Sequence, residues 1–146
     1  MSEITILCMY HKKNLVNTNF YPFFEIQCGE NESHIRLDMQ GDGQNNPISS
    51  KNRYWSEITG LYWAWKNIKK TDYIGLCSYR RFFNFEKSIY PVKLSNRLDA
   101  NEYIKNINYD CINNIFKESD IVLPFEYTYS KSVQKVCEIN YNSSDF

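Results

Sequence analysis

The chain has 146 residues, and 17 Lys and Arg balance 17 Asp and Glu, so its formal net charge is zero. Nucleic-acid-binding domains normally carry a basic excess, and we therefore expect no nucleic-acid partner. The length predicts one domain with a real core, and 42% hydrophobic and 16% aromatic residues are typical of a folded protein.

The five cysteines form no C-x-x-C pair, which disfavours a zinc site. Most of them lie in apolar runs, so we expect reduced, buried side chains in a cytoplasmic protein. The first ten residues, with an acidic Glu3, do not resemble a signal peptide, and no apolar run reaches the length of a membrane span.

Two strands are predicted in the first part of the chain. Ile4–Tyr10 is a continuous apolar run, typical of a parallel strand covered on both faces. Phe23–Gly29 is the second candidate. Residues 30–51 are polar and contain Gly41, Gly43 and Pro47, which predicts a long loop of a kind that often has a function.

The segment Asn52–Lys70 is the clearest predicted helix, with Asn52 as its N-cap. Its apolar residues recur at spacings of three and four, which predicts a face turned to the core: Trp55, Ile58, Leu61, Tyr62, Trp65 and Ile68. Trp63 falls outside this stripe. A flat aromatic ring there suits a sugar pocket, although packing under a neighbouring loop is the more common role of such a residue.

The second half predicts a strand at Tyr73–Ser78, a helix from about Ala100 to Lys117, and a buried strand at Asp120–Pro124. Residues expected on the buried side of this helix are Ile104, Ile107, Cys111 and Ile115, and Asp99 with Glu102 has capping-box spacing. A polar tail follows from about residue 126. The alternation of strands and helices predicts an α/β domain, with a mainly parallel sheet and flanking helices.

Ligands of such sheets bind beyond the carboxyl ends of the strands, so the residues there are the candidates. Arg80 and Arg81 follow the Tyr73–Ser78 strand, and their planar guanidinium groups suit a diphosphate. On an extended segment the two side chains point to opposite faces, so one is expected to reach the ligand. Structural ion pairs are an equally good interpretation of this dipeptide.

Weaker candidates lie in the other loops. His11 and Lys12 suit a phosphate contact, but a solvated basic turn is the more common role of such residues. Glu57 is either an active-site carboxylate or a partner for an arginine, and we favour the partner. No strand ends in a clear Asp-x-Asp, so no cofactor is expected; if Mg²⁺ or Mn²⁺ binds, Asp38 and Asp42 are its candidate ligands.

Three segments together resemble a known family: "GDGQNNPISSKNRYWSEITGLYWAWKN", "DYIGLCSYRRFF" and "DIVLP". They are similar in order and spacing to the domain of unknown function 4422, which occurs in bacterial capsular, exopolysaccharide and O-antigen synthesis proteins. Its members are glycosyltransferases, and one characterised activity, in glycosyltransferase family 111, is galactofuranosyl transfer from a UDP donor. The resemblance implies a GT-A-like fold that binds a nucleotide-sugar.

The resemblance also implies which residues of this chain bind the donor. They are His11, Lys12, Asp42, Asn45, Lys51, Asn52, Tyr79, Arg80 and Arg81, with Glu57 and Trp63 as candidates for the sugar pocket. Two positions depart from the family pattern: Ser78 replaces a histidine, and Asn45 or Asn46 replaces the second aspartate of the loop. Serine cannot replace imidazole as an acid, base or ligand.

The family implies a UDP-sugar donor and a lipid-linked glycan acceptor, with the protein at the inner face of the cytoplasmic membrane beside the assembly machinery. Family members continue beyond the point that corresponds to Phe146, so we expect the acceptor half to be missing from this chain. Two alternatives stay open: a catalytically inactive remnant that still binds nucleotide-sugar, and an interaction module in polysaccharide assembly.

Overall fold

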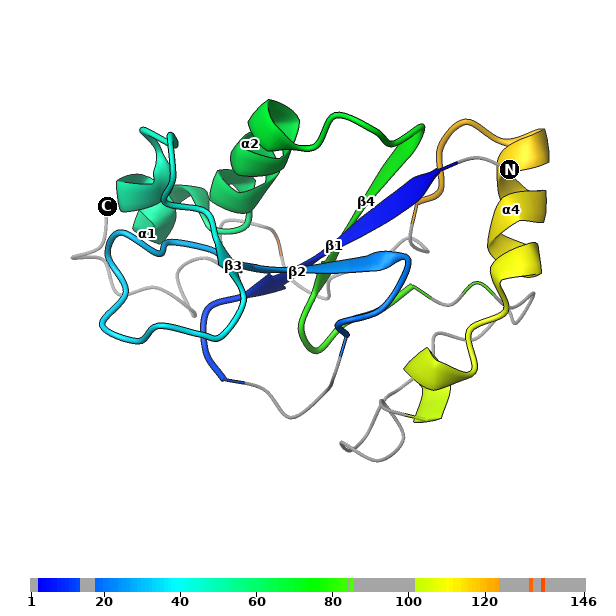
Figure 1. The fold of residues 1–146 in the computed structure, drawn as a ribbon, viewed down its shortest axis with the longest axis horizontal. Coiled ribbons are helices and arrows are strands. Elements are labelled where there is room, and N and C mark those ends of the chain that lie inside the picture. The colour runs from blue at the N-terminus through cyan, green and yellow to red at the C-terminus, as the bar shows by residue number, and fades with distance from the viewer. Residues whose placement is uncertain are drawn as a thin grey trace.

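The computed structural model describes residues 3–13, 18–83, 85, 102–123, 132 and 135. These residues contain a four-stranded parallel sheet with the strand order β3-β2-β1-β4 (Figure 1). The strands are β1 (Ile4–Tyr10), β2 (Phe23–Gln27), β3 (Gln40–Gly41) and β4 (Tyr73–Ser78). The predicted α/β class with a parallel sheet is confirmed.

β1 lies inside the sheet and pairs on both sides. Its Cys8 is opposite Glu25 of β2 and opposite Cys77 of β4. Successive side chains of a strand point to opposite faces, so Leu7 and Met9 enter one core while Ile6, Cys8 and Tyr10 enter another. Burial on both faces explains why the strand is apolar at nearly every position.

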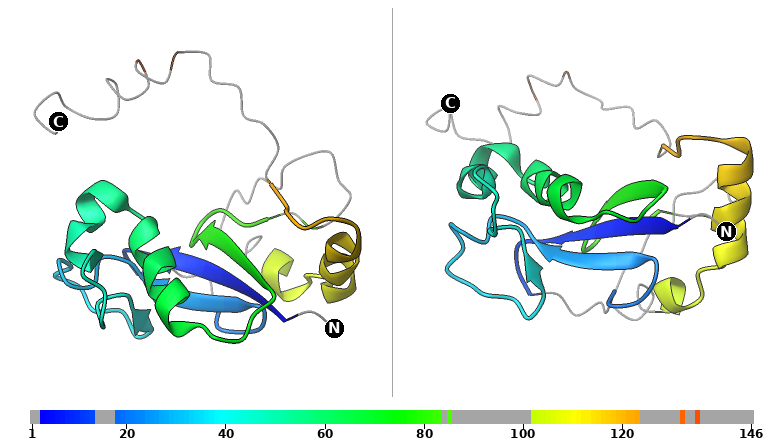
Figure 2. Two further views of the ribbon diagram at one scale, coloured as in Figure 1. Left: turned by 90° about the horizontal axis from the view of Figure 1, so that it is seen from above. Right: turned by 45° about the horizontal axis from the view of Figure 1, so that its top comes forward.

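Each face of the sheet is covered by a different part of the chain (Figure 2). α2 (Ile58–Asn67) places Trp63 and Ala64 against Leu7 and Ile26 on one face. On the other face a helical turn at 102–105 and α4 (Tyr109–Glu118) contribute a second apolar cluster, with Ile104, Ile107 and Ile112. α4 lies at the end of the sheet where β1 begins (Figure 1).

The predicted helix at 52–70 is interrupted. A 3₁₀ turn at Ser49–Lys51 leads into α1 (Asn52–Trp55), and α2 begins only at Ile58. At the break Ser56 has φ 46° and ψ −129°, a conformation that does not continue a helix. The prediction that Asn52 is the N-cap is wrong, because Asn52 is the first residue of α1. Its side-chain amide donates to the Ser56 carbonyl (2.7 Å) and the Thr59 hydroxyl (2.8 Å) and so stabilises the break.

The predicted core face of this segment is wrong in part, although Leu61 and Ile68 do pack against the core. Thr59, Gly60, Trp63 and Ala64 are buried, whereas Trp55, Ile58 and Trp65 are about half or more exposed. The reason is the close approach of α2 to the sheet at Gly60. A Cβ at Gly60 would lie 2.7 Å from the Cys28 Sγ and 2.8 Å from the Met9 Sδ, so only glycine fits.

Two predictions for the second half are also corrected. The helix expected from about Ala100 to Lys117 is broken between the turn at 102–105 and α4. The N-cap of α4 is Asn108, whose side-chain oxygen accepts from the Asp110 (2.9 Å) and Cys111 (3.3 Å) amides. The predicted Asp99 cap lies outside the described residues.

The strand predicted at Asp120–Pro124 is absent from residues 120–123, and Ile121 and Leu123 are exposed rather than buried. An apolar run alone does not distinguish a strand from an extended segment without a partner. Pro124 and most of the polar tail lie outside the described residues. In the part of the chain that is described, no helix has both the length and the apolar composition needed to cross a bilayer.

Gly60 gives a test of this packing. Helix propensity alone predicts that Gly60→Ala stabilises the protein by about 1 kcal/mol. The close contacts with Met9 and Cys28 predict the opposite sign, a loss of about 1–3 kcal/mol from overpacking. Urea unfolding measures the difference, and a gain in the free energy of unfolding would contradict the close approach of α2 to the sheet.

Candidate functional site

The candidate site lies at the carboxyl edge of the sheet. Since the four strands are parallel, the segments that follow them all emerge at this edge. His11 and Lys12 follow β1, Gly29 follows β2, Asp42 follows β3, and Arg80 follows β4. The break between α1 and α2 adds one more polar residue, the exposed Glu57.

The segment after β4 is a turn, not the extended segment that was predicted. The Arg81 amide donates to the Ser78 carbonyl (3.0 Å), and the Tyr79 amide donates to the Met9 carbonyl of β1 (3.1 Å). Tyr79 is therefore held down on the sheet, while the exposed Arg80 and Arg81 follow it at the top of the turn.

The ring of Tyr79 is the platform of the site. It stacks on Tyr10 with 5.7 Å between ring centroids, and the His11 ring meets it edge-on at 5.2 Å. The guanidinium of Arg80 lies 5.6 Å from the same ring centroid. One buried aromatic ring thus orients an imidazole from β1 and a guanidinium from β4.

Burial and the neighbouring charged side chains together lower the pKa of His11. Partial burial lowers the pKa of His11, the cations Lys12 and Arg80 lower it further, and the Glu57 carboxylate opposes them. His11, Lys12, Arg80 and Glu57 are therefore near enough to interact electrostatically. Because cations dominate around the imidazole, this edge of the sheet is suited to an anionic ligand.

Asp42 has a different environment from the one predicted for a ligand-binding residue. It is fully buried, and both carboxylate oxygens accept hydrogen bonds from the protein. Its donors are the Gly29 amide (2.9 Å), the Glu30 amide (3.0 Å) and the Ser49 hydroxyl (2.6 Å). These bonds tie the loop after β3 to the end of β2, which is a structural role.

The other proposed metal ligand, Asp38, is exposed on the loop. Within residues 3–13, 18–83, 85 and 102–123, no group of three or more His, Cys, Asp or Glu side chains is arranged to hold a metal ion. Cys28, at the end of β2, does not suit a nucleophile, because burial raises the pKa of its thiol to about 12.

The remaining candidates are distributed around the site rather than gathered in it. Asn45 (φ 53°) and Lys51 are exposed on the loop, and the side chain of Asn52 is used at the helix break. Trp63 is buried on the α2 side, stacked on Phe24 at 5.7 Å between centroids, and so contributes to the core. The structure therefore brings together His11, Lys12, Glu57, Tyr79 and Arg80.

Sequence reasoning missed the residues that hold the loop. Asn46 is buried; its amide donates to the Thr59 carbonyl (2.9 Å), and its oxygen accepts from the Ile48 amide (3.1 Å). It thereby joins the loop to α2, as Ser49 joins it to Asp42. Several Asn and Ser side chains follow one another in this loop, and no local pattern indicates which of them will be buried.

Glu25 is a second residue whose role the sequence indicates. Glu25 is a charged residue inside a buried strand, and such a residue needs partners. Its carboxylate accepts from the Thr18 hydroxyl (2.7 Å) and amide (3.1 Å) and from the Tyr10 hydroxyl (3.3 Å). Tyr10 lies directly under the Tyr79 platform, so this buried network supports the site from below.

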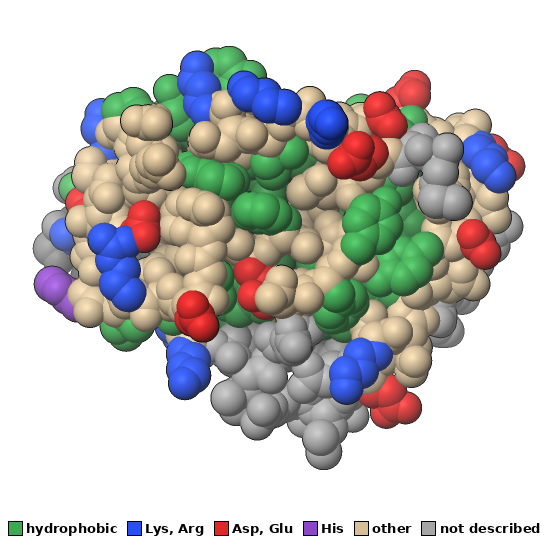
Figure 3. Space-filling view, viewed as in Figure 1, with side chains coloured by type: hydrophobic (Ala, Val, Ile, Leu, Met, Phe, Trp, Pro, Cys, Tyr) green, Lys and Arg blue, Asp and Glu red, His purple; other side chains and the backbone are tan. Residues whose placement is uncertain are grey.

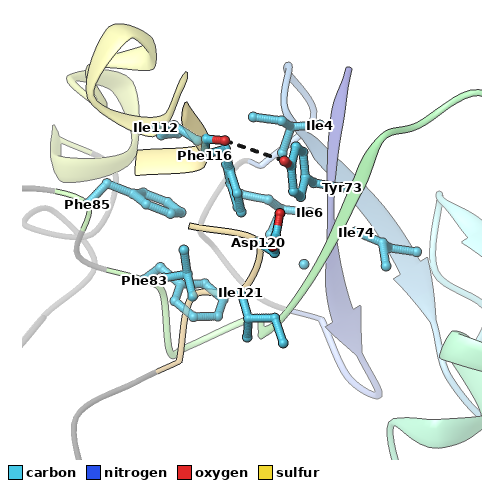
Figure 4. Close-up of a pocket in the computed structure, with 12 residues that line it drawn as sticks. Ile4, Ile6, Tyr73, Ile74, Phe83, Phe85, Ile112, Phe116, Asp120 and Ile121 are labelled. Atoms are coloured by element: carbon cyan, nitrogen blue, oxygen red, sulfur yellow. Dashed lines mark hydrogen bonds between the residues drawn. The ribbon is translucent and has the colours of Figure 1, made fainter. Parts of the chain in front are cut away.

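An apolar pocket of about 160 Å³ lies at the opposite end of the sheet (Figure 4). Figure 4 shows Phe83, Phe85, Phe116 and Ile121 around it, with Asp120 as its one charged side chain. Among its lining residues there is no Lys, Arg or His, so it does not offer partners for a diphosphate.

The chain matches one known protein family over almost its whole length. The family model "Domain of unknown function (DUF4422)" matches residues 5–146. The chain belongs to this family. No curated protein matches the DUF4422 domain described here.

A solved structure, the apo form of the bifunctional glycosyltransferase WbbM, is similar to the DUF4422 domain. The two are 31% identical, the TM-score is 0.55, and the match covers 60% of this chain and 15% of that one. The DUF4422 domain thus has a glycosyltransferase-like α/β fold and corresponds to a small part of the WbbM chain.

The role of Asp42 can be tested by its removal. In Asp42→Ala, two buried amides and a hydroxyl lose their acceptor, and we expect a loss of about 3 kcal/mol in the free energy of unfolding. The matched control is Asp38→Ala on the exposed segment before β3, with an expected change within about 0.5 kcal/mol. Similar urea midpoints for the two variants would refute the structural role.

The electrostatics of the site can be measured on His11 itself by NMR titration. We expect a His11 pKa below the ordinary value, which rises in Arg80→Ala because a cation is removed and falls further in Glu57→Gln because a carboxylate is removed. A His34→Asn variant assigns the two histidine signals. A His11 pKa that neither substitution moves would show that these groups do not face one another.

Proposed function

We propose that the DUF4422 domain binds a nucleoside diphosphate-sugar at the carboxyl edge of its sheet and forms the donor half of a glycosyltransferase. The observation that carries the proposal is the convergence of His11 and Arg80 on the Tyr79 platform, with the cation of Lys12 acting on the same imidazole. A surplus of cations at the carboxyl ends of parallel strands suits a ligand with two phosphates.

The two phosphates are expected between Lys12 and Arg80. The arginine fork binds phosphate oxygens in pairs, and the lysine adds a point charge. The negative charge of the ligand raises the affinity of His11 for a proton, so the imidazole becomes a third cation once the donor is bound. In this role Arg80 takes part of the phosphate charge that a divalent metal takes in other transferases.

Glu57 completes the proposed site as its acidic member. It acts on His11 electrostatically and lies at the α1–α2 break. A carboxylate at this position suits the hydroxyl groups of the ribose or the transferred sugar, to which it offers two acceptor oxygens. A role as the partner of Arg80 in the absence of donor is compatible with the same position.

The identity of the donor rests on the family resemblance. We propose a UDP-sugar, with galactofuranose as one candidate, and a lipid-linked glycan acceptor in the synthesis of a bacterial cell-surface polysaccharide. A specific observation favours a second candidate function, donor binding without transfer: Ser78 occupies the position of the family histidine, and serine cannot move a proton as imidazole does.

Calorimetry with UDP tests the proposed donor site. We expect Arg80→Ala to weaken binding by about 1.5–3 kcal/mol, the scale of a hydrogen bond to a charged group. The matched control is Lys105→Ala, an exposed cation on the helical turn beside α4, which should bind as the unchanged protein does. Equal affinities for the Arg80 and Lys105 variants, with both folded, would refute the phosphate site.

The same titrations, repeated with EDTA and with Mn²⁺, test the metal. We expect similar affinity in both conditions, because Lys12 and Arg80 supply the positive charge. Binding that EDTA abolishes and Mn²⁺ restores would overturn the metal-independent form of the proposal. A transfer assay with a panel of UDP-sugars and lipid-linked acceptors then separates an active transferase from a protein that only binds the donor.

A further inference from the structure

The face of α2 that points away from the sheet is unusually apolar. Ile58, Tyr62 and Trp65 follow one another at spacings of four and three, so they share one side of the helix. The rings of Tyr62 and Trp65 meet edge to face at 5.6 Å, and Trp65 is 66% exposed. We call these three residues the outer aromatic face.

This face is the opposite side of α2 from the residues that enter the core. Thr59, Gly60, Trp63 and Ala64 are buried against the sheet, which leaves Ile58 and Trp65 without cover. α1 adds Tyr54 and Trp55, which are also exposed. An exposed apolar group of this kind on a folded domain is a marker of an interaction surface.

The charges around the outer aromatic face are strongly biased, although the whole chain is neutral. Residues 51–71 contain one acidic residue, Glu57, and five basic ones: Lys51, Arg53, Lys66, Lys69 and Lys70. The ammonium of Lys66 lies 3.8 Å from the Trp65 ring centroid, so cation and aromatic ring form one unit. Figure 3 shows blue basic and green hydrophobic side chains side by side along the upper edge of the molecule, over α1 and α2.

We propose that the outer aromatic face and the surrounding cations dock the domain on an anionic lipid bilayer. Tyr and Trp rings settle at the level of the headgroups, with an apolar body and a polar edge. Ile58 adds apolar area below them, and the lysines attract anionic headgroups. α2 then lies in the plane of the interface, with its buried side still packed on the sheet.

A bilayer accounts for the composition of this surface better than a protein partner does. The centres of protein interfaces are enriched in aromatic residues but depleted in lysine. Here Lys66 lies on Trp65 itself, and Lys69 and Lys70 follow at the end of the helix. Aromatic residues mixed with lysines are instead the composition of helices that lie in a bilayer interface.

The inference goes beyond the proposed function, because it assigns a surface that lies outside the donor residues His11, Lys12 and Arg80. It is also compatible with that function. Ile58 follows Glu57 directly, so the outer aromatic face begins at the rim of the donor site. A domain docked in this way holds that rim near the headgroups, where a lipid-linked acceptor presents its glycan.

Vesicle flotation with the full chain tests the proposal without any need for donor binding or activity. We expect the protein to float with vesicles of phosphatidylcholine and phosphatidylglycerol in equal parts, to bind pure phosphatidylcholine less, and to lose binding as salt is raised. Tryptophan emission should shift to shorter wavelength when these vesicles are added. The shift should be smaller in Trp65→Phe, because Trp63 is already buried and Trp55 is then the one exposed tryptophan left.

Substitutions separate the apolar and the electrostatic parts. Ile58→Ser with Trp65→Ser should lower the partition coefficient about tenfold or more. Lys66→Ala with Lys69→Ala should lower it about fivefold per charge on the anionic vesicles and little on the neutral ones. All four side chains are exposed, so circular dichroism should show an unchanged fold. Leu123→Ser, an exposed apolar residue elsewhere, is the matched control and should bind normally.

Three results would overturn the proposal. One is the absence of flotation with anionic vesicles, and another is equal flotation of the Ile58/Trp65 double variant and the control. The third is a dimer in sedimentation that the double variant abolishes, since this would assign the face to a second copy of the chain. Because UDP affinity is measured separately, failure here leaves the donor site untouched, and failure of the donor site leaves this surface untouched.

Discussion

The parallel pairing of β1 with β2 on one side and β4 on the other is the constraint on which the rest of the domain depends. Parallel strands cannot be joined by tight turns, so the chain must return outside the sheet between them. Those returns place a long loop and α2 on the path from β2 to β4. They also bring every strand exit to one edge, where the polar residues collect.

The long connection that parallel pairing requires is held in place by buried polar contacts. Leu37 and Met39 of the loop after β2 pack against the apolar core. The carboxylate of Asp42 and the side chain of Asn46 also hold this loop. A similar arrangement lies under the site, where the side chains of Glu25, Thr18 and Tyr10 form hydrogen bonds with one another. Buried polar groups with complete partners specify one geometry, because any displacement leaves a donor or acceptor unpaired.

One face of α2 is buried and the other is exposed, and both follow from its small residues. Gly60 and Ala64 let the helix backbone approach the sheet, and Trp63 fills the space beside them against Phe24. The larger apolar residues are then excluded from that narrow contact and remain on the outside. The exposure of the proposed bilayer surface is therefore a consequence of the way in which the core is packed. The residues proposed to bind the donor occupy the adjoining edge of the same sheet.

The sequence by itself determined the α/β class, three of the four strands and the edge of the sheet where the candidate site lies. Continuous apolar runs such as Ile4–Tyr10 and the order of the elements carry that information locally. The sequence also places Arg80 just beyond the end of a strand, because the strand that precedes it can be recognised from its own residues.

Only the tertiary structure decided which way each side chain faces. The periodic stripe of Ile58, Tyr62 and Trp65 reveals an apolar side of a helix, but not whether the core or another surface covers it. That choice depends on the contacts of Gly60 with Met9 and Cys28, which are distant in sequence. For the same reason the sequence does not reveal the hydrogen bonds of Asp42, since its three donors come together only when β2, β3 and the loop are folded.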